Sequence, residues 1–183
     1  MKIRYYRDPL APGKVAQTRD PFISSASYAE MVEKTPIPCT DAVLTLKGDK
    51  ALYLVERSVY PMKGVWCLGG RIWFNDHTLH DSIARCVEIE TGQHFAPERF
   101  TLVSAPHLYS WVRTRQGEFP GKNLAVTFNL QVDDKELNSI AESLKPEEYN
   151  TEFGVQRFSR ERLVDEKVHQ AMLDVYDDIF PSP

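Results

Sequence analysis

The sequence has few cysteines and no long apolar run. Its three cysteines are odd in number and lack the spacing of cysteine metal sites. No run of about 18 apolar residues suggests a membrane span, and the first ten residues do not have the pattern of a signal peptide. These absences predict a cytoplasmic protein with no membrane partner, whose cysteines stay reduced as small buried thiols.

Positively charged residues are also fewer than negatively charged ones. The chain has 22 Lys and Arg against 26 Asp and Glu, which gives a net charge of -4 and a pI near 5.8. A general nucleic-acid binder would have a basic face, so we expect no nucleic-acid partner. A small phosphorylated ligand remains possible, because a few arginines at one site are enough to bind it.

The 183 residues, 42% of them hydrophobic, suit one soluble domain. Residues 1–23 contain three prolines and little periodicity, so they are expected to form an irregular arm before a single domain at 24–183. Helices are predicted within 24–35, 78–91, 133–144 and 166–180, and strands within 41–57 (a hairpin turning at Gly48-Asp49), 64–70, 100–112, 123–132 and 154–159.

The helix predicted after residue 77 has the clearest local signals. Leu79, Ile83 and Val87 recur at helical spacing and form one apolar stripe. Thr78 can cap the start of the helix, and Gly92 can close its end. Because helices and strands alternate along the chain, the fold class predicted is α/β (α+β mixed), a layered domain of sheet and helices.

Residues 64–92, "GVWCLGGRIWFNDHTLHDSIARCVEIETG", resemble the Nudix box, a strand, loop and helix that binds a divalent metal and a diphosphate. Arg85, Glu90 and Gly92 keep the arginine, the last glutamate and the final glycine of that pattern. Cys86 and Ile89 replace its two other helix glutamates. The loop is one residue longer than usual. The first glutamate of the box therefore falls on Asp76 or His77, and the "HTL" triplet favours His77.

The GDP-mannose mannosyl hydrolases lack the same two helix glutamates, and this chain is similar to them over roughly residues 24–180. The resemblance implies a Nudix-like α/β/α sandwich with a mixed β-sheet. It further implies a metal-dependent hydrolase of a nucleoside-diphosphate-linked substrate, in particular a nucleotide sugar. A homodimer built through the opening helix and first strand is also implied.

The resemblance also implies roles for individual residues. Glu90 and the backbone carbonyl of Gly69 would bind Mg²⁺ or Mn²⁺, which needs only one or two protein ligands beside substrate phosphates. The substrate's diphosphate would be bound by Arg57, Arg71 and Arg85. Asp41 would lie near the nucleotide leaving group. Its place in an apolar strand independently predicts that it points into a cleft or pairs with an arginine.

The catalytic base is less clearly marked. The relatives carry a Gln-His pair in a late loop, and the matching residues 145–154 contain no histidine. Glu152 lies closest to that position, with Glu147 and Glu148 as neighbours. A carboxylate that reaches the attacking water can act as the base. Solvated loop charge is an equally good interpretation of these glutamates.

Three functions remain open on the sequence alone. In the first, water attacks the anomeric carbon of a nucleotide sugar and releases a nucleoside diphosphate. In the second, water attacks phosphorus, as in ordinary Nudix pyrophosphohydrolases, which commonly use more metal than this box would hold. In the third, the missing carboxylates at Cys86 and Ile89 mean that the domain only binds a nucleotide ligand.

Overall fold

The structure is a computed structural model that describes residues 24–73, 75–103, 106–111 and 120–181. The arm expected at residues 1–23 lies outside this part of the chain. The strands are β1 (Ile37–Leu46), β2 (Leu52–Arg57), β3 (Gly64–Trp66), β4 (Leu68–Arg71), β5 (Phe100–Leu102), β6 (His107–Trp111), β7 (Gly121–Val132) and β8 (Val155–Phe158). The helices are α1 (Ser25–Lys34), α2 (Leu79–Thr91), the short η1 (Pro97–Arg99), α3 (Asp134–Ser143), α4 (Arg160–Asp165) and α5 (Gln170–Ile179).

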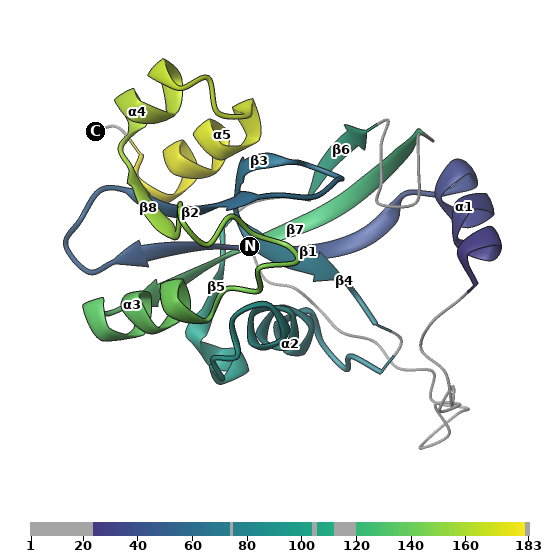
Figure 1. The fold of residues 1–183 in the computed structure, drawn as a ribbon, viewed down its shortest axis with the longest axis horizontal. Coiled ribbons are helices and arrows are strands. Elements are labelled where there is room, and N and C mark those ends of the chain that lie inside the picture. The colour runs from purple at the N-terminus through teal and green to yellow at the C-terminus, as the bar shows by residue number, and fades with distance from the viewer. Residues whose placement is uncertain (1–23, 74, 104–105, 112–119, 182–183) are drawn as a thin grey trace.

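A mixed sheet forms the middle layer, with β1 at its centre. All ten residues of β1 pair in parallel with β7, while β2 and β4 pair with β1 antiparallel. Helices α4 and α5 lie on one face of the sheet, and α2 and α3 lie on the other (Figure 1). This arrangement confirms the mixed sheet between helical layers that the sequence predicts.

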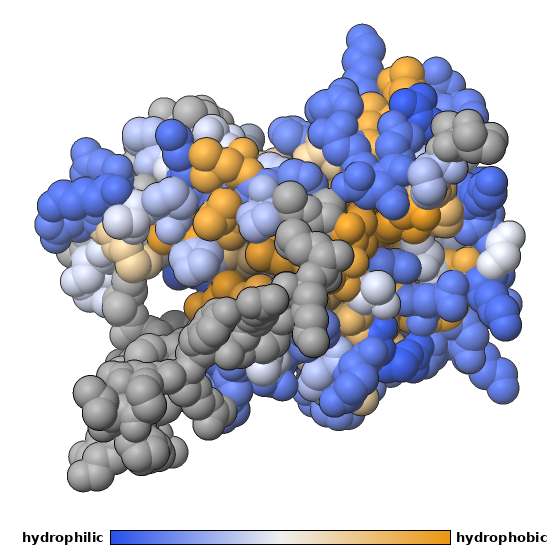
Figure 2. All heavy atoms as spheres, turned by 180° about the vertical axis from the view of Figure 1, so that it is seen from behind, coloured by the Kyte–Doolittle hydropathy of each residue, from blue (hydrophilic) through white to orange (hydrophobic). Residues whose placement is uncertain are grey.

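Two hydrophobic clusters fill the two sides of the sheet, because side chains alternate along each strand. Val43 and Leu54 belong to the cluster under α4 and α5. Their neighbours Leu44 and Val55 belong to the cluster against α2 and α3. From behind, hydrophobic surface is visible between hydrophilic groups (Figure 2). Leu108 and Leu124, which face each other across β6 and β7, are 55% and 43% exposed.

Helix α2 forms as its sequence predicts. The Thr78 hydroxyl accepts a hydrogen bond from the Asp81 amide at 3.0 Å, which caps the first turn. Gly92 ends the helix with φ 66°, a left-handed conformation that glycine adopts without a Cβ penalty. Ile83 and Val87 are fully buried against the sheet. The helix is therefore fixed at both ends and along one face.

The structure corrects several element boundaries. The strand predicted at 64–70 is two strands, because β3 pairs with β2 and β4 pairs with β1. The strand predicted at 100–112 is likewise two, β5 and β6. The helix predicted at 166–180 begins only at Gln170, where the His169 side chain accepts from the Ala171 amide, and α4 precedes it. Strand β1 begins at Ile37, four residues before the predicted hairpin. In the described part of the chain, no helix is both long and apolar enough to cross a membrane.

Candidate functional site

Gly69 brings the β4 backbone unusually close to β1. It pairs with Asp41 in the antiparallel register and has φ 149°, which L side chains rarely adopt. A Cβ placed on Gly69 would lie 2.5 Å from both Asp41 Oδ1 and the Thr40 carbonyl oxygen. Only glycine therefore permits this approach, and the approach places the Gly69 amide in front of helix α2.

Glu90 meets Gly69 from the last turn of α2. Its Oε2 accepts a hydrogen bond from the Gly69 amide at 2.8 Å, and the residue is only 6% exposed. Burial raises the pKa of Glu90 to about 7, and the Arg57 charge and the Gly69 amide oppose that rise. The two residues predicted as metal ligands are thus in direct contact.

Arg57 is a nearly buried cation at the end of β2. Its Nη2 lies 3.6 Å from a Glu148 carboxylate oxygen, and its Cζ lies 5.8 Å from the centre of the Tyr149 ring. Burial acts to lower the pKa of Arg57, but Tyr149, Glu90, Glu148 and Asp41 raise it overall. Its Nε is buried and makes no hydrogen bond. The Tyr149 hydroxyl is also buried, and burial and the neighbouring Glu90 carboxylate both raise its pKa.

The late loop is docked against this cluster by its backbone. The Ser58 amide donates to the Glu148 carbonyl at 2.8 Å, and the Lys145 amide donates to the Glu90 carbonyl at 3.2 Å. Tyr149 pairs with Arg57 as an isolated bridge. These bonds place Glu148 and Tyr149 at the site.

Glu152, predicted as the base, lies elsewhere on the loop. It is exposed, and its amide donates to the Asn150 side chain at 3.1 Å. Among the late-loop glutamates, the one that contacts a predicted site residue is Glu148. Glu148 is predicted from the sequence only as a neighbour of the base, and Tyr149, an aromatic residue within a largely charged and polar loop, is not predicted at all.

Asp41 is a buried carboxylate, 7% exposed, with no hydrogen-bond or ion-pair partner among the described residues. Burial raises its pKa to about 7, and the charge of Arg57 opposes the shift. Thr127 lies beside it on β7 and is fully buried. Buried polar groups without partners are costly, so the Asp41 carboxylate marks a place where a ligand group could bind.

Arg85 is held by its own helix and the loop before it. Its guanidinium binds both oxygens of Asp76, at 2.8 and 2.6 Å, and also donates to the Arg71 carbonyl at 2.8 Å. Its Cζ lies 4.0 Å from the centre of the Trp73 ring. Asp76, rather than the favoured His77, is therefore the acidic residue that faces the arginine of the box.

The remaining box positions do not supply carboxylates. The Cys86 thiol is buried against Gly70, where a Cβ would lie 3.2 Å from its sulfur, and burial raises its pKa to about 12. Ile89 is 37% exposed. Arg71, at the end of β4, is exposed. Among the described residues, no three His, Cys, Asp or Glu side chains are grouped to hold a metal ion.

Two surface pockets, of about 380 and 490 Å³, lie away from these residues. The first is at the β1–β2 turn and the end of α5, and the second is between the end of α1 and the β6 and β7 ends. None of the residues predicted from the sequence for the site lines either pocket.

No protein-family model matches the sequence, and no curated protein is significantly similar to it. Solved structures share its fold. The MutT protein of Methanosarcina mazei Go1 superposes with a TM-score of 0.54 at 18% identity, over 79% of this chain and 93% of that chain. NrtR of Shewanella oneidensis, complexed with a 27mer DNA, gives 0.51 at 17% identity over 77% and 60%.

A MutT NUDIX hydrolase from Burkholderia pseudomallei is a further match, with a TM-score of 0.48 at 16% identity, over 70% of this chain and 86% of that chain. Together with the sheet and helix order, the likeness to the MutT protein and to NrtR shows that this chain shares their fold, which confirms the mixed α/β fold predicted from the sequence. Identities of 16–18% do not identify a substrate.

Proposed function

We propose that this chain is a hydrolase of a nucleoside-diphosphate-linked compound, with a nucleotide sugar of the GDP-mannose kind as its substrate. The observation that carries the proposal is the largely buried guanidinium of Arg57, which pairs with Glu148 at 3.6 Å, is influenced by the charge of Glu90 and has an Nε without a hydrogen bond. Arg57 Nε can only donate, and it has no acceptor among the described residues. The group that would satisfy it is an acceptor, such as a phosphate oxygen.

The arginines have different parts in this proposal. Arg57 and the exposed Arg71 bind the diphosphate, because a guanidinium stays charged and binds phosphate oxygens in pairs. Arg85 would reach phosphate only by leaving Asp76. Its main part is to tie the loop after β4 to α2, and so to hold Gly69 in front of Glu90.

The site offers a divalent metal two protein ligands. Glu90 offers a carboxylate and Gly69 a carbonyl, both hard oxygen ligands, and only a glycine lets the backbone come so close. Mg²⁺ or Mn²⁺ held by these two residues would neutralise charge on the leaving diphosphate. So small a protein ligand set suits an ion that keeps several waters and takes oxygens from the substrate.

The proposed reaction breaks the bond between the anomeric carbon and the diphosphate oxygen, and water forms the new bond to that carbon. Glu148 takes the proton of this water in preference to Glu152, since Glu148 lies at the Arg57 cluster. Asp41 accepts hydrogen bonds from donors on the nucleotide, which gives its buried carboxylate the partner that it lacks. Attack at carbon is preferred to attack at phosphorus because Cys86 and Ile89 leave Glu90 as the remaining one of the three box glutamates on the helix.

The test is a screen of nucleotide sugars with and without Mg²⁺, in which the products are separated. A nucleoside diphosphate and a free sugar are expected. Glu90→Gln should abolish the metal-dependent turnover while the circular dichroism spectrum stays unchanged. Glu88→Gln is the matched control, because Glu88 lies on the same helix and pairs with His94 at the surface.

Each other outcome selects a different function. A nucleoside monophosphate and a sugar phosphate would mean attack at phosphorus. Binding of a nucleotide sugar with no turnover would mean a ligand-binding module, a function consistent with the absence of a three-residue metal cluster in the described residues. Full activity of the Glu90→Gln variant would show that the metal is held elsewhere.

A further inference from the structure

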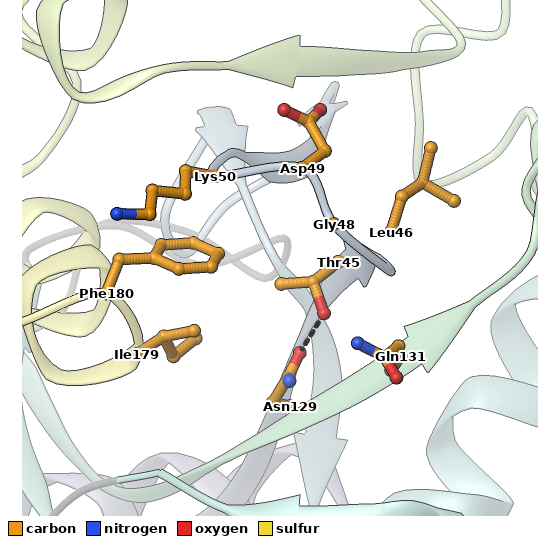
Figure 3. Close-up of a pocket in the computed structure, with 9 residues that line it drawn as sticks. All are labelled: Thr45, Leu46, Gly48, Asp49, Lys50, Asn129, Gln131, Ile179 and Phe180. Carbon is orange, nitrogen blue, oxygen red and sulfur yellow. Dashed lines mark hydrogen bonds between the residues drawn. The ribbon is translucent and has the colours of Figure 1, made fainter.

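The first of the two surface pockets lies on the α5 side of the sheet, where β1 ends at the β1–β2 turn. It has a volume of about 380 Å³ and is lined by the β1–β2 turn, two residues of β7 and the end of α5 (Figure 3). Thr45, in its floor, comes four residues after Asp41 on the same strand, so the two are about 13 Å apart at the rise of a β-strand. The pocket is therefore separate from the proposed active site.

The rim of this pocket is held in place by hydrogen bonds on several sides. Asp49 accepts from Arg157 at 2.7 and 2.6 Å and from the Tyr53 hydroxyl at 2.8 Å. The Tyr176 hydroxyl, on α5, donates to the Lys50 carbonyl at 2.9 Å. These bonds fix the turn relative to both β8 and α5. The pocket is thus formed before any ligand arrives, which lowers the entropic cost of binding.

Hydrogen-bond donors are left over inside the pocket. The Thr45 hydroxyl donates to Asn129 Oδ1 at 2.9 Å, which fixes that amide and leaves its Nδ2 without a partner among the described residues. The Gln131 amide also has no side-chain partner in the described part of the chain, and neither has the exposed Lys50 ammonium, whose side chain extends along the rim past Phe180 (Figure 3). Since Arg157 neutralises Asp49, the charge that remains at the rim is the positive charge of Lys50.

The opposite wall is apolar. Figure 3 shows the side chains of Ile179 and Phe180 pointing from the end of α5 toward the amides of β7. A phenyl ring offers a flat face or edge to another ring, while amide and ammonium donors suit acceptor oxygens and ring nitrogens. A volume of this size lies at the lower end of the range for small-ligand sites.

We propose that this pocket binds a small planar anion, a heteroaromatic ring that carries a phosphate or carboxylate, of about the size of a nucleoside monophosphate. The ring packs against Phe180, its acceptors take hydrogen bonds from Asn129 and Gln131, and its anionic group pairs with Lys50. The site is independent of the hydrolase proposed above.

The experiment is a titration of the ¹⁵N-labelled full chain with guanosine 5′-monophosphate, followed by the side-chain amide signals of Asn129 and Gln131. Guanosine and inorganic phosphate are titrated in parallel, because each lacks one half of the probe. Saturable shifts are expected with the monophosphate. Lys50→Ala and Gln131→Ala should each weaken its affinity by about tenfold. Lys47→Ala, an exposed lysine of the same turn outside the pocket, should leave the affinity unchanged.

Arg57→Ala separates this proposal from the proposed active site. The Asn129 and Gln131 shifts should persist in that variant, whether or not the chain hydrolyses any nucleotide sugar. Shifts that vanish with Arg57→Ala, or an equal loss of affinity in Lys47→Ala, would overturn the second site. So would the absence of saturable shifts at millimolar probe.

Discussion

Gly69→Ala is the substitution that should most directly disturb the site. The new Cβ would lie 2.5 Å from Asp41 Oδ1 and from the Thr40 carbonyl oxygen, and 2.8 Å from the Asp41 Cα. Two of these three atoms are backbone, so the overlap cannot be relieved by turning a side chain. Either β4 moves away from β1 or the Gly69 amide turns away from Glu90.

The expected cost has two parts. A left-handed φ costs a non-glycine residue about 1–2 kcal/mol, and relieving the overlap by shifting backbone costs about 1–3 kcal/mol. Gly69→Ala should therefore lower the free energy of unfolding by about 2–5 kcal/mol. It should also weaken metal-dependent turnover, because the amide that orients Glu90 is displaced.

Urea unfolding followed by fluorescence measures the first effect, and Gly154→Ala is the matched control. Gly154 has φ 62° with no atom within 4 Å of its ideal Cβ position, so its substitution carries the φ cost alone. Gly69→Ala should lose about 1–3 kcal/mol more than this control. Equal losses in the two variants would refute the close approach of β4 to Asp41.

Four further outcomes are expected. Glu148→Gln should lower kcat by about 10²-fold or more, whereas Glu152→Gln should leave it unchanged. Asp76→Asn should cost about 2 kcal/mol of stability, measured in urea at pH 7. The pKa of Asp76 is lowered in the folded state. Its contribution is therefore present above its unfolded pKa of about 4 and lost as the pH falls through the lower folded value. The free energy of unfolding of the Asp76→Asn variant should therefore fall less steeply than that of the parent chain as the pH is lowered below about 4. Sedimentation at micromolar concentration should give the mass of a dimer, and a monomer mass would count against the predicted homodimer. Calorimetry should show weaker binding of GDP in EDTA than in Mg²⁺, and equal binding would mean that the arginines suffice.

The parts of the fold that the sequence predicts well are those whose signals are local. Helix α2 begins at the predicted cap and ends at the predicted glycine, since both act within four residues of the bonds that they satisfy. The break between β3 and β4 depends on which neighbouring strand each half pairs with, and no periodicity in 64–70 contains that information. The last predicted helix is divided at His169, whose side chain accepts from the Ala171 amide two residues on, a local cap that the apolar spacing of 166–180 does not reveal.

The contacts of the site also divide into those that the sequence predicts and those that depend on the fold. The resemblance to the Nudix box predicts that Gly69 and Glu90 act together, and the structure brings them into contact. The partner of Arg85 could not be read from helical spacing, because Asp76 lies in the loop before the helix and not one turn away on it. Glu148 reaches Arg57 only because the late loop is bonded to the backbone beyond β2, a long-range contact that the loop's own sequence does not encode.

The charge balance of the cluster gives the reason why a cation should accompany the substrate. Asp41, Glu90 and Glu148 all influence the largely buried guanidinium of Arg57, so three carboxyl groups lie around this cation. Two like charges 5 Å apart repel by about 3 kcal/mol at an effective dielectric constant of about 20. A bare diphosphate would meet this repulsion from more than one carboxylate, and Arg57 is already partly balanced by Glu148. A cation bound at Glu90 and Gly69 would offset this repulsion and attract the diphosphate. Glu90, the one box glutamate kept on the helix, therefore fits a site in which the diphosphate and its cation bind together.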